Sequence, residues 1–152
     1  MNAADQFHVG IVVDDLHAAL AQLGEPFGYE WCAMFDGPVP VMLPTGPIEI
    51  GLRFVYSRNT PRVEVIQSIP GTLWVPASGS GIHHLGYWSD DVARDSAELQ
   101  RRGLTGEASG IRPDGTLVWS YHRSPTGPRV ELVDRQLQSG MEQMWATTLT
   151  AS

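Results

Sequence analysis

The chain contains an internal repeat, which limits its possible folds more than any other feature of the sequence. Residues 7–23, FHVGIVVDDLHAALAQL, align with residues 83–99, HHLGYWSDDVARDSAEL, at an offset of 76 positions. Further along, PRVEVI (61–66) aligns with PRVELV (128–133) at an offset of 67 positions. Each repeat therefore opens with the pattern H-x-G-x-x-x-D-D and closes with P-R-V-E. Two matched segments in the same order are not explained by chance.

The repeats divide the chain into two modules. They span about residues 1–68 and 82–135, and the linker between them, residues 69–81, is rich in Pro, Gly and Ser. Residues 136–152 form a C-terminal tail, in which QLQSGMEQMWATTL predicts a short helix. Because 152 residues are enough to build one compact core, we expect a single domain over residues 1–152.

The first module begins with a predicted strand and helix. Residues 7–13 are apolar and β-branched, which predicts a strand, and Asp14 or Asp15 then supplies the N-cap of a helix. Apolar side chains follow at the i, i+3, i+4, i+7 spacing of an amphipathic helix. Gly24 is the expected end of this helix.

The second module repeats this pattern, and three further strands follow the helix in each module. Its first strand is expected at residues 82–89 and its helix at about 91–102, ended by Gly103. The further strands are expected at residues 29–34, 48–57 and 61–68, and at residues 104–109, 116–122 and 129–134. Residues 35–47, which contain four prolines, predict a loop. The order βαβββ, found twice, predicts an α+β fold whose two sheets line a shared cleft.

Strand alternation places one histidine of each module on the cleft side. His8 and Gly10 share a strand face, and the opposite face is uniformly apolar and suits packing against the helix. In the second module His84, Gly86 and Trp88 share the corresponding face. Each glycine leaves room beside its histidine for a bound metal or substrate.

One glutamate of each module accompanies these histidines. Glu64 and Glu131 lie in the middle of apolar strands, where a carboxylate is costly unless it is paired or bound to a metal. Two imidazoles and two carboxylates around one point suit a divalent transition metal such as Zn, Ni, Co, Mn or Fe. The structural alternative is an ion pair along the strand between each glutamate and Arg62 or Arg129.

These residues resemble the vicinal-oxygen-chelate superfamily, which includes glyoxalase I, methylmalonyl-CoA epimerase, extradiol dioxygenases and fosfomycin or bleomycin resistance proteins. The similarity covers about residues 6–135, and GIHHLGYWSDDV (81–92) and VEVIQSIPGT (63–72) are similar to the epimerase-like branch. The resemblance implies a glyoxalase-like fold and one metal ion held by His8, Glu64, His84 and Glu131. Epimerases often place Gln at the first late-strand position, whereas two His and two Glu look more like glyoxalase I.

The resemblance further implies that a small substrate chelates the metal through oxygen and loses a proton next to a carbonyl or thioester. Isomerase, epimerase or lyase chemistry follows, with Glu131 or Glu64 as the base and Glu49 as a second candidate. Trp88 and His122 are candidates for contacts with the substrate. Two alternatives stay open: an Fe(II)-dependent dioxygenase, which typically uses two histidines and one carboxylate, and a resistance-type protein that only binds a small molecule.

Composition limits the classes of molecule that the protein is expected to bind. The net charge of −7 argues against nucleic acid and against an anionic membrane surface. The single cysteine, Cys32, cannot form an internal disulfide, and the N-terminal residues do not resemble a signal peptide, so a cytoplasmic setting is expected. No apolar stretch reaches the length needed to span a bilayer. We expect a small-molecule substrate and a homodimer.

Overall fold

The computed structural model describes residues 1–150 and has the α+β fold of two successive βαβββ modules. The first module consists of β1 (Gln6–Val13), α1 (Leu16–Phe27), β2 (Phe35–Leu43), β3 (Gly46–Tyr56) and β4 (Val63–Gln67). The second consists of β5 (Ile82–Ser89), α2 (Val92–Arg101), β6 (Thr105–Ile111), β7 (Leu117–Arg123) and β8 (Arg129–Asp134). The helix predicted in the tail is α3 (Gln138–Trp145), and 3-10 turns occupy Ala3–Asp5 and Arg135–Leu137.

The described residues form two compact units, one around each repeat. The first-repeat unit holds residues 8–37, 51–83 and 139–150. The second-repeat unit holds residues 1–7, 38–50 and 84–138. The hairpin made by β2 and β3 therefore contributes to both units, and each unit carries one complete His/Glu pair of the repeat.

In the first-repeat unit, β4 is the central strand. It pairs in parallel with β1, where Gly10 lies opposite Glu64, and antiparallel with β3, where Tyr56 lies opposite the same Glu64. Helix α1 packs on β4 through an apolar face that includes the buried Leu16 and Leu20. This arrangement leaves Glu64 in the middle of a three-stranded segment.

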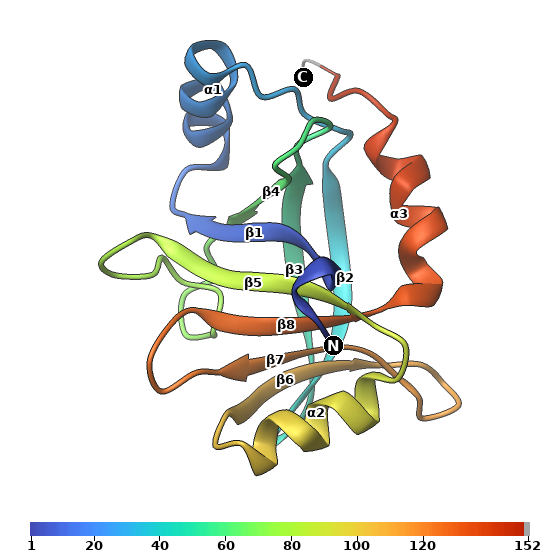
Figure 1. Ribbon diagram of the computed structural model, residues 1–152. Helices are drawn as coiled ribbons and strands as arrows, with labels where there is room; N and C mark the ends of the chain where they lie inside the picture. The colour runs from blue at the N-terminus through green and yellow to red at the C-terminus, as the bar shows by residue number, and fades with distance from the viewer. Residues whose placement is uncertain (151–152) are drawn as a thin grey trace. The chain divides into compact units, whose positions relative to one another are not determined.

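The second-repeat unit reproduces this arrangement. Strand β8 pairs in parallel with β5, where Gly86 lies opposite Glu131, and antiparallel with β7, where Tyr121 lies opposite Glu131. Strand β6 continues the sheet beyond β7. In Figure 1, α2 lies along β6 and β7, and its apolar side chains Val92 and Leu99 pack with Leu132 of β8. The sequence repeat is thus also a repeat of strand order and register.

Helix α1 ends four residues later than the sequence predicts. Asp15 is its N-cap and accepts a hydrogen bond from the backbone N–H of Ala18, as expected. The predicted end at Gly24 is wrong, because the helix continues to Phe27. Gly28 supplies the left-handed conformation that a helix end needs, with φ 72°, and its N–H donates to the carbonyl oxygen of Gly24.

The connection between α1 and β3 also differs from the prediction. Residues 29–34 form no strand and make only an isolated bridge between Trp31 and Ser57. The predicted loop at 35–47 is instead strand β2 with a turn after it. Pro38 and Pro40 are two positions apart, so their missing N–H groups fall on one edge of the strand and the other edge keeps its donors.

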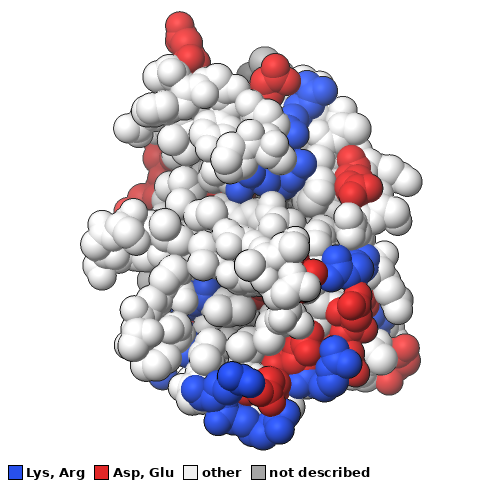
Figure 2. Space-filling view, in the orientation of Figure 1, with Lys and Arg blue, Asp and Glu red and all other residues white. Residues whose placement is uncertain are grey.

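The outer face of α2 is charged. Figure 2 shows blue and red side chains close together at the lower end of the molecule, where Figure 1 places α2. Glu98 forms ion pairs with Arg101 and Arg102, one turn further along the helix. None of the helices within residues 1–150 is long and apolar enough to cross a lipid bilayer.

Candidate metal centre

The first-repeat unit holds one buried histidine–glutamate pair. His8 of β1 and Glu64 of β4 are both buried, and Nε2 of His8 lies 3.5 Å from Oε2 of Glu64. Gly10, two residues after His8 on the same strand face, lies opposite Glu64 and carries no side chain. The ring of Tyr56 meets the His8 ring edge-on, with centroids 5.3 Å apart.

The second-repeat unit holds the equivalent pair with nearly the same dimensions. His84 of β5 and Glu131 of β8 are buried, and Nε2 of His84 lies 3.5 Å from Oε2 of Glu131. The ring of Tyr121 meets the His84 ring edge-on at a centroid distance of 5.1 Å. The fold therefore builds the same group of Tyr, His and Glu twice, once in each unit.

The spacing within each pair suits two ligands of one metal ion. A separation of 3.5 Å exceeds that of a good N–H···O hydrogen bond, which is about 2.7–3.2 Å. Two ligand atoms bonded to one ion at about 2.1 Å lie about 3.0–3.4 Å apart for bond angles between octahedral and tetrahedral, so the observed 3.5 Å is slightly longer than the upper end of this range. Imidazole nitrogen and carboxylate oxygen are ligands that Zn, Ni, Co, Mn and Fe all accept. Each pair thus has the donor chemistry and the spacing of half a metal site.

Comparison with known proteins identifies the family. Residues 7–121 match the model of the Glyoxalase/Bleomycin resistance protein/Dioxygenase superfamily. The chain belongs to this superfamily. No curated protein matches the sequence significantly.

Several solved structures resemble the chain at low sequence identity. A hypothetical protein from Bacillus halodurans has a TM-score of 0.59 and 17% identity, over 85% of this chain and 92% of that one. Methylmalonyl-CoA epimerase from Mycobacterium tuberculosis has a TM-score of 0.54 and 18% identity, over 88% of this chain and 92% of that one. 4-Hydroxymandelate synthase from Streptomyces coelicolor has a TM-score of 0.54 and 15% identity, over 85% of this chain and 48% of that one. At these identities the likeness establishes the fold.

Tyr56 and Tyr121 were not predicted from the sequence, although the sequence contains a pattern that marks both. Each module contains Y-x-R before P-R-V-E, with Tyr56 eight positions before Glu64 and Tyr121 ten positions before Glu131. The loop before P-R-V-E is two residues longer in the second module, so a search at one fixed offset does not align the tyrosines. In the structure, strand pairing places each tyrosine opposite the glutamate of its own module, whatever the length of the loop between them.

The arginines of the two P-R-V-E segments have other partners than the glutamates. Arg129 forms an ion pair with Glu107 of β6, at 2.6 Å between Nε and Oε2. Arg62 donates hydrogen bonds to the carbonyl oxygens of Ser57 and Arg58, and its guanidinium lies 3.8 Å from the ring centroid of Trp145 in α3. These contacts replace the ion pairs along the strand that were the structural alternative for Glu64 and Glu131.

Three other residues singled out from the sequence lie in different surroundings. Trp88 is buried and stacks on Phe7, with ring centroids 3.8 Å apart. Glu49 is exposed on β3. His122 is buried on the face of β7 opposite to Tyr121, and its Nε2 lies 2.8 Å from the hydroxyl of Ser96 in α2. His122 therefore faces the helix, whereas Tyr121 faces the His84 pair.

The two remaining histidines, His83 and His17, lie in different surroundings. His83 is buried, and its Nε2 donates a hydrogen bond of 2.8 Å to the carbonyl oxygen of Leu73. This contact fastens the linker to the start of β5. His17 is exposed on α1, as its position in the helix predicts.

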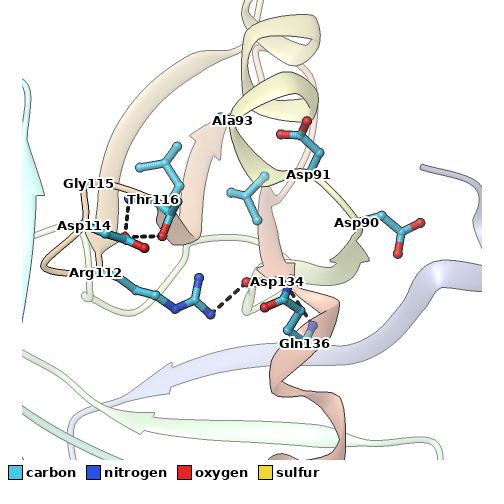
Figure 3. Close-up of a pocket in the computed structure, with 11 residues that line it drawn as sticks. Asp90, Asp91, Ala93, Arg112, Asp114, Gly115, Thr116, Asp134 and Gln136 are labelled. Carbon is cyan, nitrogen blue, oxygen red and sulfur yellow. Dashed lines mark hydrogen bonds and ion pairs between the residues drawn. The ribbon is translucent and has the colours of Figure 1, made fainter.

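A separate cavity of about 540 Å³ lies at the N-terminal end of α2 in the second-repeat unit (Figure 3). Arg112 reaches across it to Asp134, with 2.8 Å between the guanidinium and the carboxylate. Asp114 accepts hydrogen bonds from the backbone and the hydroxyl of Thr116. These polar groups of the cavity thus already have partners in the protein, so the cavity is a weaker candidate for a functional site than the histidine–glutamate pairs.

Proposed function

We propose that the protein is a metal-dependent isomerase, epimerase or lyase in which His8, Glu64, His84 and Glu131 hold a single divalent ion. The observation that carries this proposal is the repeated geometry. Each repeat builds a buried pair with its two donor atoms 3.5 Å apart, and each pair supplies two ligands. Membership of the glyoxalase superfamily supports the combination of the two pairs in one site.

A bound divalent ion acts as a Lewis acid and stabilises negative charge on a substrate oxygen. The reaction that fits this site is removal of a proton from carbon next to a carbonyl or thioester. The C–H bonding pair moves toward the carbonyl, an enolate forms, and a glutamate carboxylate takes the proton. Return of the proton to the other face gives epimerisation, and return to the neighbouring atom gives isomerisation. We assign the base to Glu131 or Glu64, whose carboxylate would have to be released from the ion to take the proton.

Burial of the glutamates supports this role. Glu64 and Glu131 are both buried, so little water competes with a substrate for contact with either carboxylate. The methylmalonyl-CoA epimerases among the similar structures support a thioester as one substrate class to test. We propose a small-molecule substrate, a cytoplasmic setting and a homodimer as further parts of this function.

Oxygen chemistry is the second candidate, because the family description includes dioxygenases and 4-hydroxymandelate synthase is among the similar structures. Two carboxylates beside two histidines leave fewer open positions for O2 than the two-histidine, one-carboxylate arrangement of Fe(II) oxygenases. Oxygen consumption by the Fe(II)-loaded protein would favour this candidate over proton transfer.

The metal content of the purified protein is the first test. We expect about one equivalent of a divalent metal per chain in the parent protein after reconstitution. His84→Ala and His8→Ala should each lose most of it, because each removes one ligand. His17→Ala, which changes an exposed histidine on α1, should keep it. A parent protein that binds none of Zn, Ni, Co, Mn and Fe(II) would refute the metal site and favour a protein that only binds a small molecule.

Deuterium incorporation tests the reaction. The metal-loaded protein is incubated with methylmalonyl-CoA in D2O, and the label at the carbon next to the thioester is measured by mass spectrometry. Exchange that depends on both glutamates supports proton transfer. If label enters no faster than in buffer for this and other carbonyl compounds, the proton-transfer proposal fails even where the metal binds.

A further inference from the structure

The second-repeat unit contains a cavity lined by two serines at positions where the first repeat has buried apolar side chains. It has a volume of about 290 Å³ and lies between α2, β6, β7 and the end of β2. The apolar part of its lining comes from Met42, Leu43, Pro44 and Leu117. The polar part comes from the second repeat itself and is unusual for the space between a helix and a sheet.

Three polar side chains of this lining are almost completely buried. Ser96 of α2 and Ser120 and His122 of β7 each expose 7% or less of their surface. Gln100 donates a hydrogen bond to the hydroxyl oxygen of Ser96, which leaves the Ser96 hydroxyl to donate to Nε2 of His122 at 2.8 Å. Burial lowers the pKa of His122, so the imidazole is neutral and can accept this bond.

Ser120 differs from the other two because its hydroxyl has no hydrogen-bond partner among the described residues. Its exposed fraction is 3%, and a buried hydroxyl without a partner costs about 1–3 kcal/mol of stability. Because Ser120 and His122 are two positions apart on β7, both project from the same strand face into the cavity lining. The hydroxyl is therefore, among residues 1–150, an unpaired donor on the cavity side of β7, next to the space that a bound molecule would occupy.

The first repeat shows that the fold does not require serines at positions 96 and 120. The offset that aligns His8 with His84 aligns Leu20 with Ser96, and the strand register that aligns Tyr56 with Tyr121 aligns Val55 with Ser120. Leu20 and Val55 are both buried. The second repeat thus has two serines where an ordinary apolar core would be more stable, which indicates a role other than packing.

We propose that this cavity is a second binding site, for a small neutral molecule with a hydroxyl or carbonyl group. The polar head of the molecule binds the Ser120 hydroxyl beside the Ser96–His122 pair, and its apolar body lies against Met42, Leu43 and Leu117. A neutral ligand fits because, among residues 1–150, Glu107 is the only charged residue of the lining, and both Arg129 and Arg123 form ion pairs with it. The site does not depend on the metal centre.

The test uses cyclohexanol and cyclohexanone as probes, with benzene as the apolar control, added to 15N-labelled protein. We expect saturable shifts of the backbone amide signals of Ser96, Gln100, Ser120 and His122 with a dissociation constant on the order of 1 mM. Benzene should bind at least tenfold more weakly. Absence of saturable shifts with both polar probes would overturn the proposal, and so would equal binding of benzene.

Two variants distinguish the contribution of the Ser120 hydroxyl to binding from the contribution of the cavity's shape. Ser120→Val introduces the side chain of the first repeat and should abolish binding of both polar probes. Ser120→Ala removes the hydroxyl without adding volume and should weaken cyclohexanol binding at least tenfold. Thr45→Ala, at an exposed position of the turn after β2, should bind like the parent. Parent-like binding by Ser120→Ala in a folded protein would refute the role of the hydroxyl.

Discussion

The ring of Tyr121 meets the ring of His84 edge-on, with centroids 5.1 Å apart and ring planes at 84°. Tyr121 also lies directly across the strand pair from Glu131. One aromatic side chain of β7 is thus next to both members of the His84–Glu131 pair. Because the same relationship links Tyr56 to His8 and Glu64, we infer that these tyrosines hold the two histidine rings in orientation.

Removal of the Tyr121 ring should therefore weaken metal binding as well as stability. Tyr121→Ala deletes a buried aromatic side chain and should lower the free energy of unfolding by about 3–5 kcal/mol. Its metal affinity should fall by about tenfold or more, since neighbours that orient ligands typically contribute 10–100-fold. Tyr121→Phe keeps the ring and should retain the metal. Competition with a chelator measures the affinity, and a Phe variant as defective as the Ala variant would assign the effect to the hydroxyl.

Replacement of one glutamate by its amide tests the ligand role directly. Glu131→Gln keeps the size of the side chain but removes the negative charge that stabilises a divalent ion. We expect a loss of metal affinity of about 100-fold, and Glu64→Gln should behave similarly because the two pairs have the same spacing. Glu49→Gln, at an exposed position of β3, is the matched control and should bind metal like the parent. Calorimetric titration with Zn or Ni measures all three.

Helix α3 is joined to the first repeat by aromatic contacts, which suggests a third prediction. Trp145 is buried, packs edge-on against Tyr56 at 5.8 Å and lies against the guanidinium of Arg62. Trp145→Ala should lower the free energy of unfolding by about 3–5 kcal/mol. Arg62→Lys removes the planar group that stacks on Trp145 and should lower the free energy of unfolding by about 1 kcal/mol. Arg62→Ala should lower it by more. Denaturant unfolding measures these changes, and a Trp145→Ala variant as stable as the parent would show that α3 does not stabilise the unit.

The sequence predicted the parts of the structure that the repeat carries. His8, Glu64, His84 and Glu131 were predicted because they recur at matched positions, and the structure pairs them within each unit as the strand pattern implies. Strand β2 was missed because its prolines resemble a loop, and only the neighbouring strands reveal which edge they leave intact. The polar cavity was missed because Ser96 and Ser120 are far apart in sequence and neither is unusual alone. The two serines come to line one cavity only because α2 packs against β7.

The buried serine of that cavity should limit the stability of the protein. Ser120→Val replaces a hydroxyl that has no partner among residues 1–150 by the apolar side chain that the first repeat uses. We expect the free energy of unfolding to rise by about 1 kcal/mol, because removal of a buried unsatisfied group regains its desolvation cost. Ser57→Val is the contrasting change, since the Ser57 hydroxyl bonds both the Asn59 carbonyl and the Val63 N–H, and it should destabilise. If both variants are destabilised equally, the Ser120 hydroxyl has a partner in solution.

The buried imidazole of His122 should make stability depend on pH near neutrality. Burial is the main cause that lowers the pKa of His122 in the folded state, whereas the unfolded chain keeps the ordinary value of about 6.5. As the pH falls below about 6.5, the unfolded state therefore binds a proton that the folded state does not, and the stability contributed by the neutral ring is lost. His122→Gln retains a hydrogen-bonding side chain that does not titrate, so its free energy of unfolding should fall less between pH 7 and pH 5 than that of the parent. His17→Gln, at an exposed position, should follow the parent curve. Equal slopes for the parent and His122→Gln would show that His122 takes up its proton without unfolding.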